Sequence, residues 1–317
     1  MHLVVLDLNA LIGMQLEKMR PAIELHLGND QNLLIISDHF FLEACDAGMP
    51  RLEKMLSALI PYRDRVRVGR WHHELIGMEV SMRGAICPAH LMSADGRSER
   101  VQNQLEDLSN GKHPFRAFFP KNKLPRPLRK RLSLPATARE IHRRFDILEE
   151  AVTKTDGNKS LRGDHDKDLR KRLFLMREWE TNAIELCVRL ARRHTAEILE
   201  YYGAGKDVAA RIASGDSFTF RRELAYWIRC LMLRRDDKLH TLKRRALELI
   251  RNEHFDVEFV GFSSHAHLAV TDDKDNRKNL ELLERAMEHV KAKWIGPAIE
   301  PTRIQRVPQV SPLHTPP

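Results

Sequence analysis

Two short apolar runs near the N-terminus, separated by a helical stretch, constrain the fold of this 317-residue chain more than any other feature. The first run, VVLDL, occupies residues 4–8, and the second, NLLIIS, occupies residues 32–37. The residues around 13–27 have helical character. Two strands of one sheet that are joined through a helix run parallel to each other. The sequence therefore predicts an α/β fold with a mainly parallel central sheet.

Further strands and helices are predicted towards both ends of the chain. We expect a long helix from about 38 to 58, and RVRV at 65–68 is typical of a third, more exposed strand. Near the C-terminus, FDVEFVGF (255–262) and HLAVTD (267–272) are interpreted as two more strands, and a helix is predicted over 276–294. The two halves of one sheet thus come from opposite ends of the chain.

A large helical insertion is predicted between these two halves. Residues 1–84 and 251–294 form the α/β domain, and residues 85–250 form the insertion, which has the amphipathic period of long helices in its second half. The last residues, 295–317, are rich in proline and lack a regular period, so we expect a flexible tail. The long helices of the insertion could also support a homodimer.

Composition limits the kind of protein further. Lys and Arg number 53 against 44 Asp and Glu, which gives a net charge of +9 and favours a polyanionic partner. The four cysteines form no C-x-x-C pair, which favours a reduced, cytoplasmic setting over a disulfide framework or a zinc knuckle. No stretch approaches the length of apolar sequence that a membrane span requires. We therefore expect no membrane partner.

The segment 116–144 concentrates the positive charge. It carries ten Lys or Arg residues, one acidic residue and four prolines. Such charges can neutralise phosphates while aromatic rings stack on unpaired bases, although a solvated loop or a site for an acidic protein would have the same composition. The residues that we expect to bind nucleic acid are Lys121, Lys123, Arg126, Arg129, Lys130, Arg131, Phe118 and Phe119.

Acidic and amide side chains follow three of the predicted strands. Asp7 and Asn9 follow the first, Glu43 lies in the helix after the second, and TDDKDN at 271–276 follows the last. Ligands of parallel α/β sheets bind at the carboxyl ends of the strands, and clustered carboxylates need a cation to offset their repulsion. Oxygen ligands of this kind suit Mg²⁺ or Mn²⁺. The pattern therefore predicts a divalent-metal site.

In this order, VVLDLNALI, IISDHFFLEA and LAVTDDKD resemble the PIN domain family of metal-dependent nucleases. The resemblance implies a PIN-like three-layer fold, interrupted here by the insertion, in which Asp7, Glu43 and Asp273 are the catalytic metal ligands. It implies Asn9 as an auxiliary polar group and Thr271 as a supporting hydroxyl. It covers about 50 residues at the start and about 40 near the end of the chain. PIN domains are commonly less than half this length.

The family usually supplies one further acid, on a helix before the last strand, and the sequence leaves that position open. Asp237 lies on a helix that leads towards the late strands, and Asp216 lies at a predicted helix start. The remaining candidates are Glu223, Asp236, Asp256, Asp272 and Asp275.

The activity that the resemblance implies is hydrolysis of phosphodiester bonds by an endonuclease, with RNA a more common substrate than DNA. In a bacterium, such a protein would be a toxin or a defence ribonuclease. Metal-assisted hydrolysis needs no protein nucleophile. The alternative is a PIN-like module that binds nucleic acid or protein and has lost catalysis.

Three other site types fit the sequence less well. A haloacid-dehalogenase-type phosphatase needs D-x-D after its first strand, whereas this chain has Asn9 in the second position. The pair His265 and His267 could bind zinc only if both rings shared one face. The R-x4-H motif of the all-helical HEPN nucleases occurs three times, ending at His72, His194 and His240, and the motif to test is the one that ends at His194, within a long predicted helix of the insertion.

Overall fold

The computed structural model describes most of the predicted α/β domain and much of the predicted insertion. The described residues are 2–7, 21, 23–29, 31–37, 40, 49–114, 143–144, 146–148, 150, 177–235, 247–271 and 273–290. The strands among them are β1 (Leu3–Leu6), β2 (Leu33–Ile36), β3 (Val66–Val68) and β4 (Leu268–Val270). The longer helices are α3 (Met49–Ser57), α4 (His72–Met82), α5 (Arg97–Ser109), α10 (Arg177–Tyr201), α11 (Lys206–Ser214), α12 (Phe218–Arg235), α14 (Leu247–Ser263) and α15 (Lys274–His289).

The four described strands form one parallel sheet in the order β3-β2-β1-β4. In the register of the sheet, Leu3 pairs with Leu33, and Val4 pairs with Leu268 on the other side of β1. The predicted α/β class and parallel sheet are confirmed. The third strand is less exposed than expected, because Val66 and Val68 are both buried and only Arg67 between them is partly exposed.

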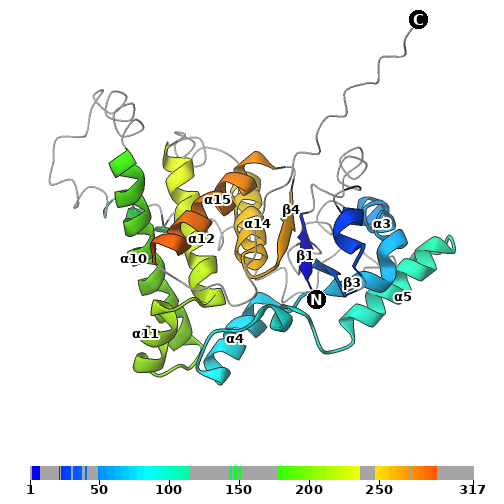
Figure 1. Cartoon of the computed structure of the whole chain (residues 1–317), viewed down its shortest axis with the longest axis horizontal. Coiled ribbons are helices and arrows are strands. Elements are labelled where there is room, and N and C mark those ends of the chain that lie inside the picture. Colours follow the sequence, from blue (N-terminus) through cyan, green and yellow to red (C-terminus); the bar gives the residue numbers. More distant parts are fainter. Residues whose placement is uncertain are drawn as a thin grey trace, which may run out of the picture.

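Helices cover both faces of the sheet (Figure 1). Successive side chains of a strand point to opposite faces, so Leu3 and Val5 enter one hydrophobic cluster while Val4 and Leu6 enter another. The first cluster is built with residues of α10, α12, α14 and α15, and the second with residues of α3 and α5. Burial on both faces explains why β1, β2 and β4 are apolar without interruption.

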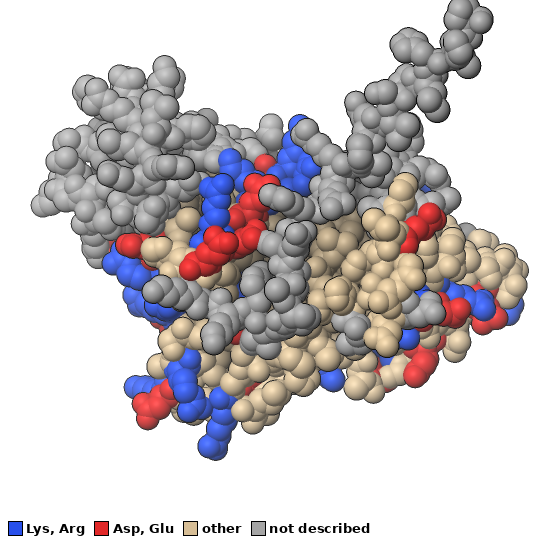
Figure 2. All heavy atoms as spheres, viewed as in Figure 1, with Lys and Arg blue, Asp and Glu red and all other residues tan. Residues whose placement is uncertain are grey.

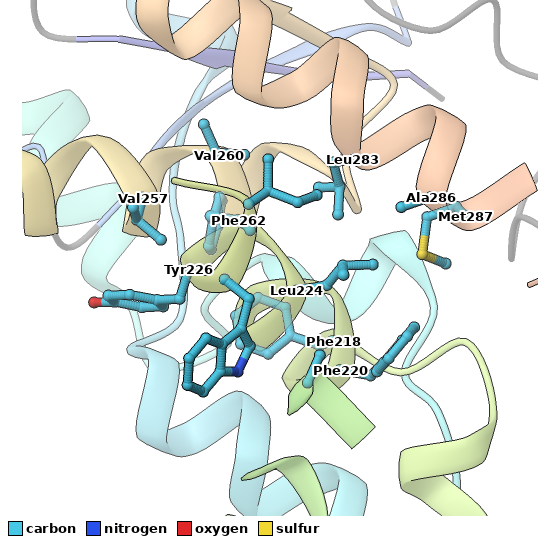
Figure 3. Packing of buried hydrophobic residues seen from close by; sticks show 14 of the residues in the cluster. Phe218, Phe220, Leu224, Tyr226, Val257, Val260, Phe262, Leu283, Ala286 and Met287 are labelled. Atoms are coloured by element: carbon cyan, nitrogen blue, oxygen red, sulfur yellow. The ribbon is translucent and has the colours of Figure 1, made fainter. Parts of the chain in front are cut away.

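The segment FDVEFVGF is helical, so its prediction as a strand is wrong. It forms the second half of α14, where Phe255, Val257, Phe259, Val260 and Phe262 are all at most 5% exposed. The helix contacts α12 and α15, and Figure 3 shows side chains of all three helices in one core. A helix buried on nearly every side has no polar face, so its apolar pattern does not distinguish it from a strand.

Helix α12 runs through the centre of the larger cluster. Trp227, Phe218 and Leu224 are fully buried there. The first turn of α12 is capped from a distant part of the sequence, because the Glu79 carboxylate of α4 accepts hydrogen bonds from the backbone N–H of Phe218 and from the N–H and hydroxyl of Thr219. The helices of the predicted insertion therefore share a core with the sheet.

No helix in the described ranges combines the length and the apolarity that crossing a membrane would require.

Candidate functional site

The carboxyl end of β1 carries Asp7, which is 5% exposed. Its backbone N–H donates to Val270 of β4 at 2.9 Å, and the Thr271 hydroxyl donates to Asp7 Oδ2. Because β2 and β4 lie on opposite sides of β1, the strand order changes direction here, and such a point is where parallel α/β sheets bind ligands. The structure thus brings two predicted site residues, Asp7 and Thr271, together at the expected edge.

One side-chain amide joins Asp7 to a second acid. Asn276 Nδ2, from the first turn of α15, donates to Asp7 Oδ2 at 3.3 Å and to Asp256 Oδ1 at 3.2 Å. Asp256 lies on α14, the helix that precedes β4. Asn276 is fully buried. The amide therefore holds carboxylates from two different elements next to each other.

Asp273 lies beside this pair but has a structural task of its own. It is the N-cap of α15, and its Oδ1 accepts from the backbone N–H groups of Asp275 at 2.7 Å and Asn276 at 2.9 Å. Its own N–H donates to the Thr271 hydroxyl at 3.0 Å. Asp273 thus fixes the start of the helix that carries Asn276.

A basic side chain also enters the cluster. Arg229 of α12 donates from Nε to Glu253 at 2.6 Å and from Nη2 to Asp256 Oδ2 at 3.3 Å. The same Nη2 lies 3.8 Å from Asp275 Oδ2. Glu253 and Asp256 are three residues apart on α14, so they share a face of that helix. We call Asp7, Glu253, Asp256, Asp273 and Asp275 the acidic edge.

The electrostatics show that Asp256 feels this concentration of negative charge. Burial raises the pKa of the Asp256 carboxyl well above its usual range, and the Arg229 guanidinium opposes that shift. The carboxylates of Asp7, Glu253 and Asp273 raise the pKa further. Burial and the neighbouring carboxylates thus disfavour the ionised form of Asp256, and positive charge near this residue would favour it.

The donor atoms fit a hard divalent ion. Besides carboxylate oxygens, Asn276 Oδ1 is buried with no hydrogen-bond partner among the described residues. Oxygen donors of these two kinds bind Mg²⁺ and Mn²⁺. Within the described part of the chain, no three His, Cys, Asp or Glu side chains are close enough to hold a metal ion by themselves. The described side chains thus offer oxygen donors of a suitable kind, without a complete set of ligands among them.

Several predicted site residues lie outside the described residues. These are the metal-ligand candidates Glu43, Asp236, Asp237 and Asp272, the auxiliary Asn9, and the nucleic-acid candidates Lys121, Lys123, Arg126, Arg129, Lys130, Arg131, Phe118 and Phe119. On the face in Figure 2, the described Lys and Arg side chains are interspersed with Asp and Glu.

Asp216, another metal-ligand candidate, is used elsewhere. Its carboxylate forms a bidentate salt bridge with Arg221 near the start of α12. Arg229 lies eight residues further along the same helix, which is a distance of about 12 Å. Asp216 therefore lies near the opposite end of α12 from Arg229.

A second group of charges is buried between α10, α12 and α14. Glu223 forms a salt bridge with Arg144 at 2.8 Å and accepts a hydrogen bond from Arg222 at 2.7 Å, and Arg222 also bonds Glu258. His194 Nδ1 lies 3.3 Å from Glu223, and the pKa of the Glu223 carboxyl falls to about 2, because the nearby cations outweigh the effect of burial. This ion-pair network fixes the helices relative to one another.

The HEPN and zinc alternatives gain no geometric support. In the motif that ends at His194, Arg189 is exposed, whereas the histidine is buried and contacts Glu223. The arginine is thus in solvent while the histidine is in the core. In the other alternative, His267 Nδ1 accepts from the Leu3 N–H, whereas His265 packs against Phe218.

Sequence reasoning missed three members of the site, namely Glu253, Arg229 and Asn276. Asp256 was one of several open candidates, and its interpretation as a strand residue hid that it shares a helical face with Glu253. Arg229 and Asn276 were not predicted at all. The spacing of Asp273 and Asn276, an N-cap residue and a residue three positions later, was the available signal for the latter.

Comparisons with models of protein families, with curated proteins and with solved structures found no match to this chain.

Proposed function

We propose that this chain is a divalent-metal-dependent endonuclease of PIN-like architecture that hydrolyses phosphodiester bonds, with RNA as its main substrate. The observation that carries the proposal is the pair of carboxylates, Asp7 from β1 and Asp256 from α14, held by one Asn276 amide at the point where the strand order changes. Asp256 also fits the position, on a helix before the last strand, that the sequence left open.

The residues of the site have distinct tasks in this proposal. Asp7 and Asp256 would hold a Mg²⁺ or Mn²⁺ ion, and Asn276 Oδ1 is a further oxygen donor beside them. When bound, such an ion lowers the pKa of a water molecule and neutralises charge on the phosphate. Thr271 fixes the orientation of the Asp7 carboxylate, and Asp273 orients the first turn of α15. No protein nucleophile is required.

The experiment compares cleavage of labelled single-stranded RNA and DNA in Mn²⁺ and in EDTA. The variants are Asp7→Asn and Asp256→Asn, and the matched control is Asp64→Asn, whose side chain is 86% exposed. We expect the wild type and the control to cut RNA in Mn²⁺ only, and each site variant to lose about 100-fold or more in rate.

Two results would overturn the proposal. The first is cleavage by the wild type that persists in EDTA, and the second is full activity of Asp256→Asn. RNA that is bound but not cut by the wild type would instead support the alternative of a binding module without catalysis.

A further inference from the structure

Arg229 is a basic side chain inserted among acids that carry the proposed cation site. Its Nε and Nη2 contact Glu253 at 2.6 Å and Asp256 at 3.3 Å, and Nη2 lies 3.8 Å from Asp275. The Arg229 side chain is 5% exposed, so water screens these contacts little. The guanidinium therefore neutralises part of the same negative charge that a divalent cation at the proposed site would neutralise.

Among the described residues, the polar contacts of the Arg229 side chain are made with acids. Its remaining nitrogen, Nη1, is buried and has no hydrogen-bond acceptor among the described residues. A buried guanidinium N–H group without an acceptor is unfavourable, so attraction to the carboxylates is what keeps the side chain there. A change in the charge of those carboxylates would therefore change the attraction that offsets the cost of burying Nη1 without an acceptor.

The helix that carries Arg229 is itself fixed. Two turns earlier on α12, Arg222 bonds Glu258 of α14 at 2.8 Å. At the same level, Gly261 of α14 approaches Arg222 so closely that a Cβ atom there would lie 3.1 Å from the Arg222 Cα. The two helices are thus held in close contact, and this packing places the guanidinium of Arg229 next to Glu253 and Asp256.

We propose that Arg229 is the internal counter-ion of the acidic edge, and that it competes with a divalent cation for Asp256. In the cation-free chain it partly neutralises the acids and stabilises the fold. When a cation binds, the guanidinium opposes it through like-charge repulsion and sets a lower affinity than the acids alone would give. This inference rests on the proposed function, since it concerns the same site.

The test measures Mn²⁺ binding by calorimetry and melting temperature in EDTA and in Mn²⁺. The variants are Arg229→Gln, which removes the charge, and Arg229→Lys, which keeps it. Arg193→Gln is the control, because Arg193 pairs with Glu197 on the exposed side of α10. A double variant, Arg229→Gln with Asp256→Asn, removes the guanidinium charge together with one carboxylate.

We expect Arg229→Gln to melt below the wild type in EDTA and to bind Mn²⁺ about tenfold more tightly. Arg229→Lys and Arg193→Gln should stay within about threefold of wild-type affinity. The double variant should recover much of the lost melting temperature. If Arg229→Gln does not fold in EDTA, its rescue by Asp256→Asn gives the same support, and failure of that rescue overturns the inference.

Other outcomes separate this inference from the proposed function. Unchanged or weaker Mn²⁺ binding by folded Arg229→Gln overturns the competition. A wild type that binds no Mn²⁺ overturns the proposed function. The counter-ion role then depends on the melting temperatures alone, and a double variant no more stable than Arg229→Gln would refute it.

Discussion

Replacing Asn276 by aspartate would place a third carboxyl group between Asp7 and Asp256. The amide nitrogen lies 3.3 Å from one carboxylate and 3.2 Å from the other, and the residue is fully buried. An ionised carboxylate at this position would lose both hydrogen bonds and gain two like-charge contacts. Each contact would cost about 5 kcal/mol at an effective dielectric constant of about 20.

Protonation limits that cost. An aspartate with an ordinary pKa of about 3.9 can be kept neutral at a cost of about 4 kcal/mol at pH 7 and about 1.5 kcal/mol at pH 5. A neutral carboxyl group can still donate one hydrogen bond. We therefore expect Asn276→Asp to lower the free energy of unfolding in EDTA by about these amounts. A bound Mn²⁺ ion should recover most of the loss at pH 7, because it favours the ionised carboxylate.

The assay is urea unfolding followed by circular dichroism, at both pH values, in EDTA and in Mn²⁺. Asn279→Asp is the matched control, since Asn279 is also fully buried on α15, one turn later, and its Nδ2 donates to the Ala225 carbonyl at 3.4 Å. The control should lose stability without recovery in Mn²⁺. The reasoning is refuted if Asn276→Asp loses less than about 1 kcal/mol at pH 7 in EDTA, or if Mn²⁺ rescues both variants equally.

The remaining predictions concern charges elsewhere in the fold. Burial raises the pKa of the Glu79 carboxyl to about 7, so between pH 4.5 and 7 the native state retains a proton that the unfolded chain releases. The free energy of unfolding should therefore decrease by about 3 kcal/mol as the pH rises from 4.5 to 7. This decrease should be absent in Glu79→Gln. Burial lowers the pKa of His267 to about 4, so stability should fall as the pH decreases from 6.5 to 4. The loss should be about 1–2 kcal/mol, smaller than for Glu79 because solvent screens a ring that is less deeply buried, and His267→Gln should abolish it in urea titrations. Glu223→Gln removes the buried negative charge that is paired with Arg144 and Arg222, and it should cost about 3–5 kcal/mol. Glu197→Gln, in an exposed pair, should cost below about 0.5 kcal/mol in the same assay.

The sheet could be predicted from the sequence because its strands are buried on both faces. The run LVVL and the run LLII contain no polar residue, and each is short enough to exclude a helix of ordinary length. The same logic failed for 255–262, where α14 is also buried on nearly every side. Burial alone therefore indicated the core, whereas the local geometry depended on neighbours that the sequence does not display.

The candidate site divides in a similar way. Asp7 and Thr271 follow strands, so the rule for parallel sheets was enough to place them at one edge. Arg229 reaches Asp256 only because α12 packs against α14, and that contact leaves no local pattern in the sequence. Asn276 could be recognised as part of a capped first turn, but its bonds to two carboxylates depend on how α15 meets the sheet.

The central claim is that Asp7 and Asp256 together hold a divalent cation. Anomalous X-ray diffraction from crystals grown with Mn²⁺ tests it most directly, because it locates the ion itself. We predict an anomalous peak within coordination distance, about 2–2.5 Å, of carboxylate oxygens from both residues, and its loss in Asp256→Asn crystals. A peak elsewhere in the molecule, or no peak in crystals of a chain that binds Mn²⁺ in solution, would contradict the account.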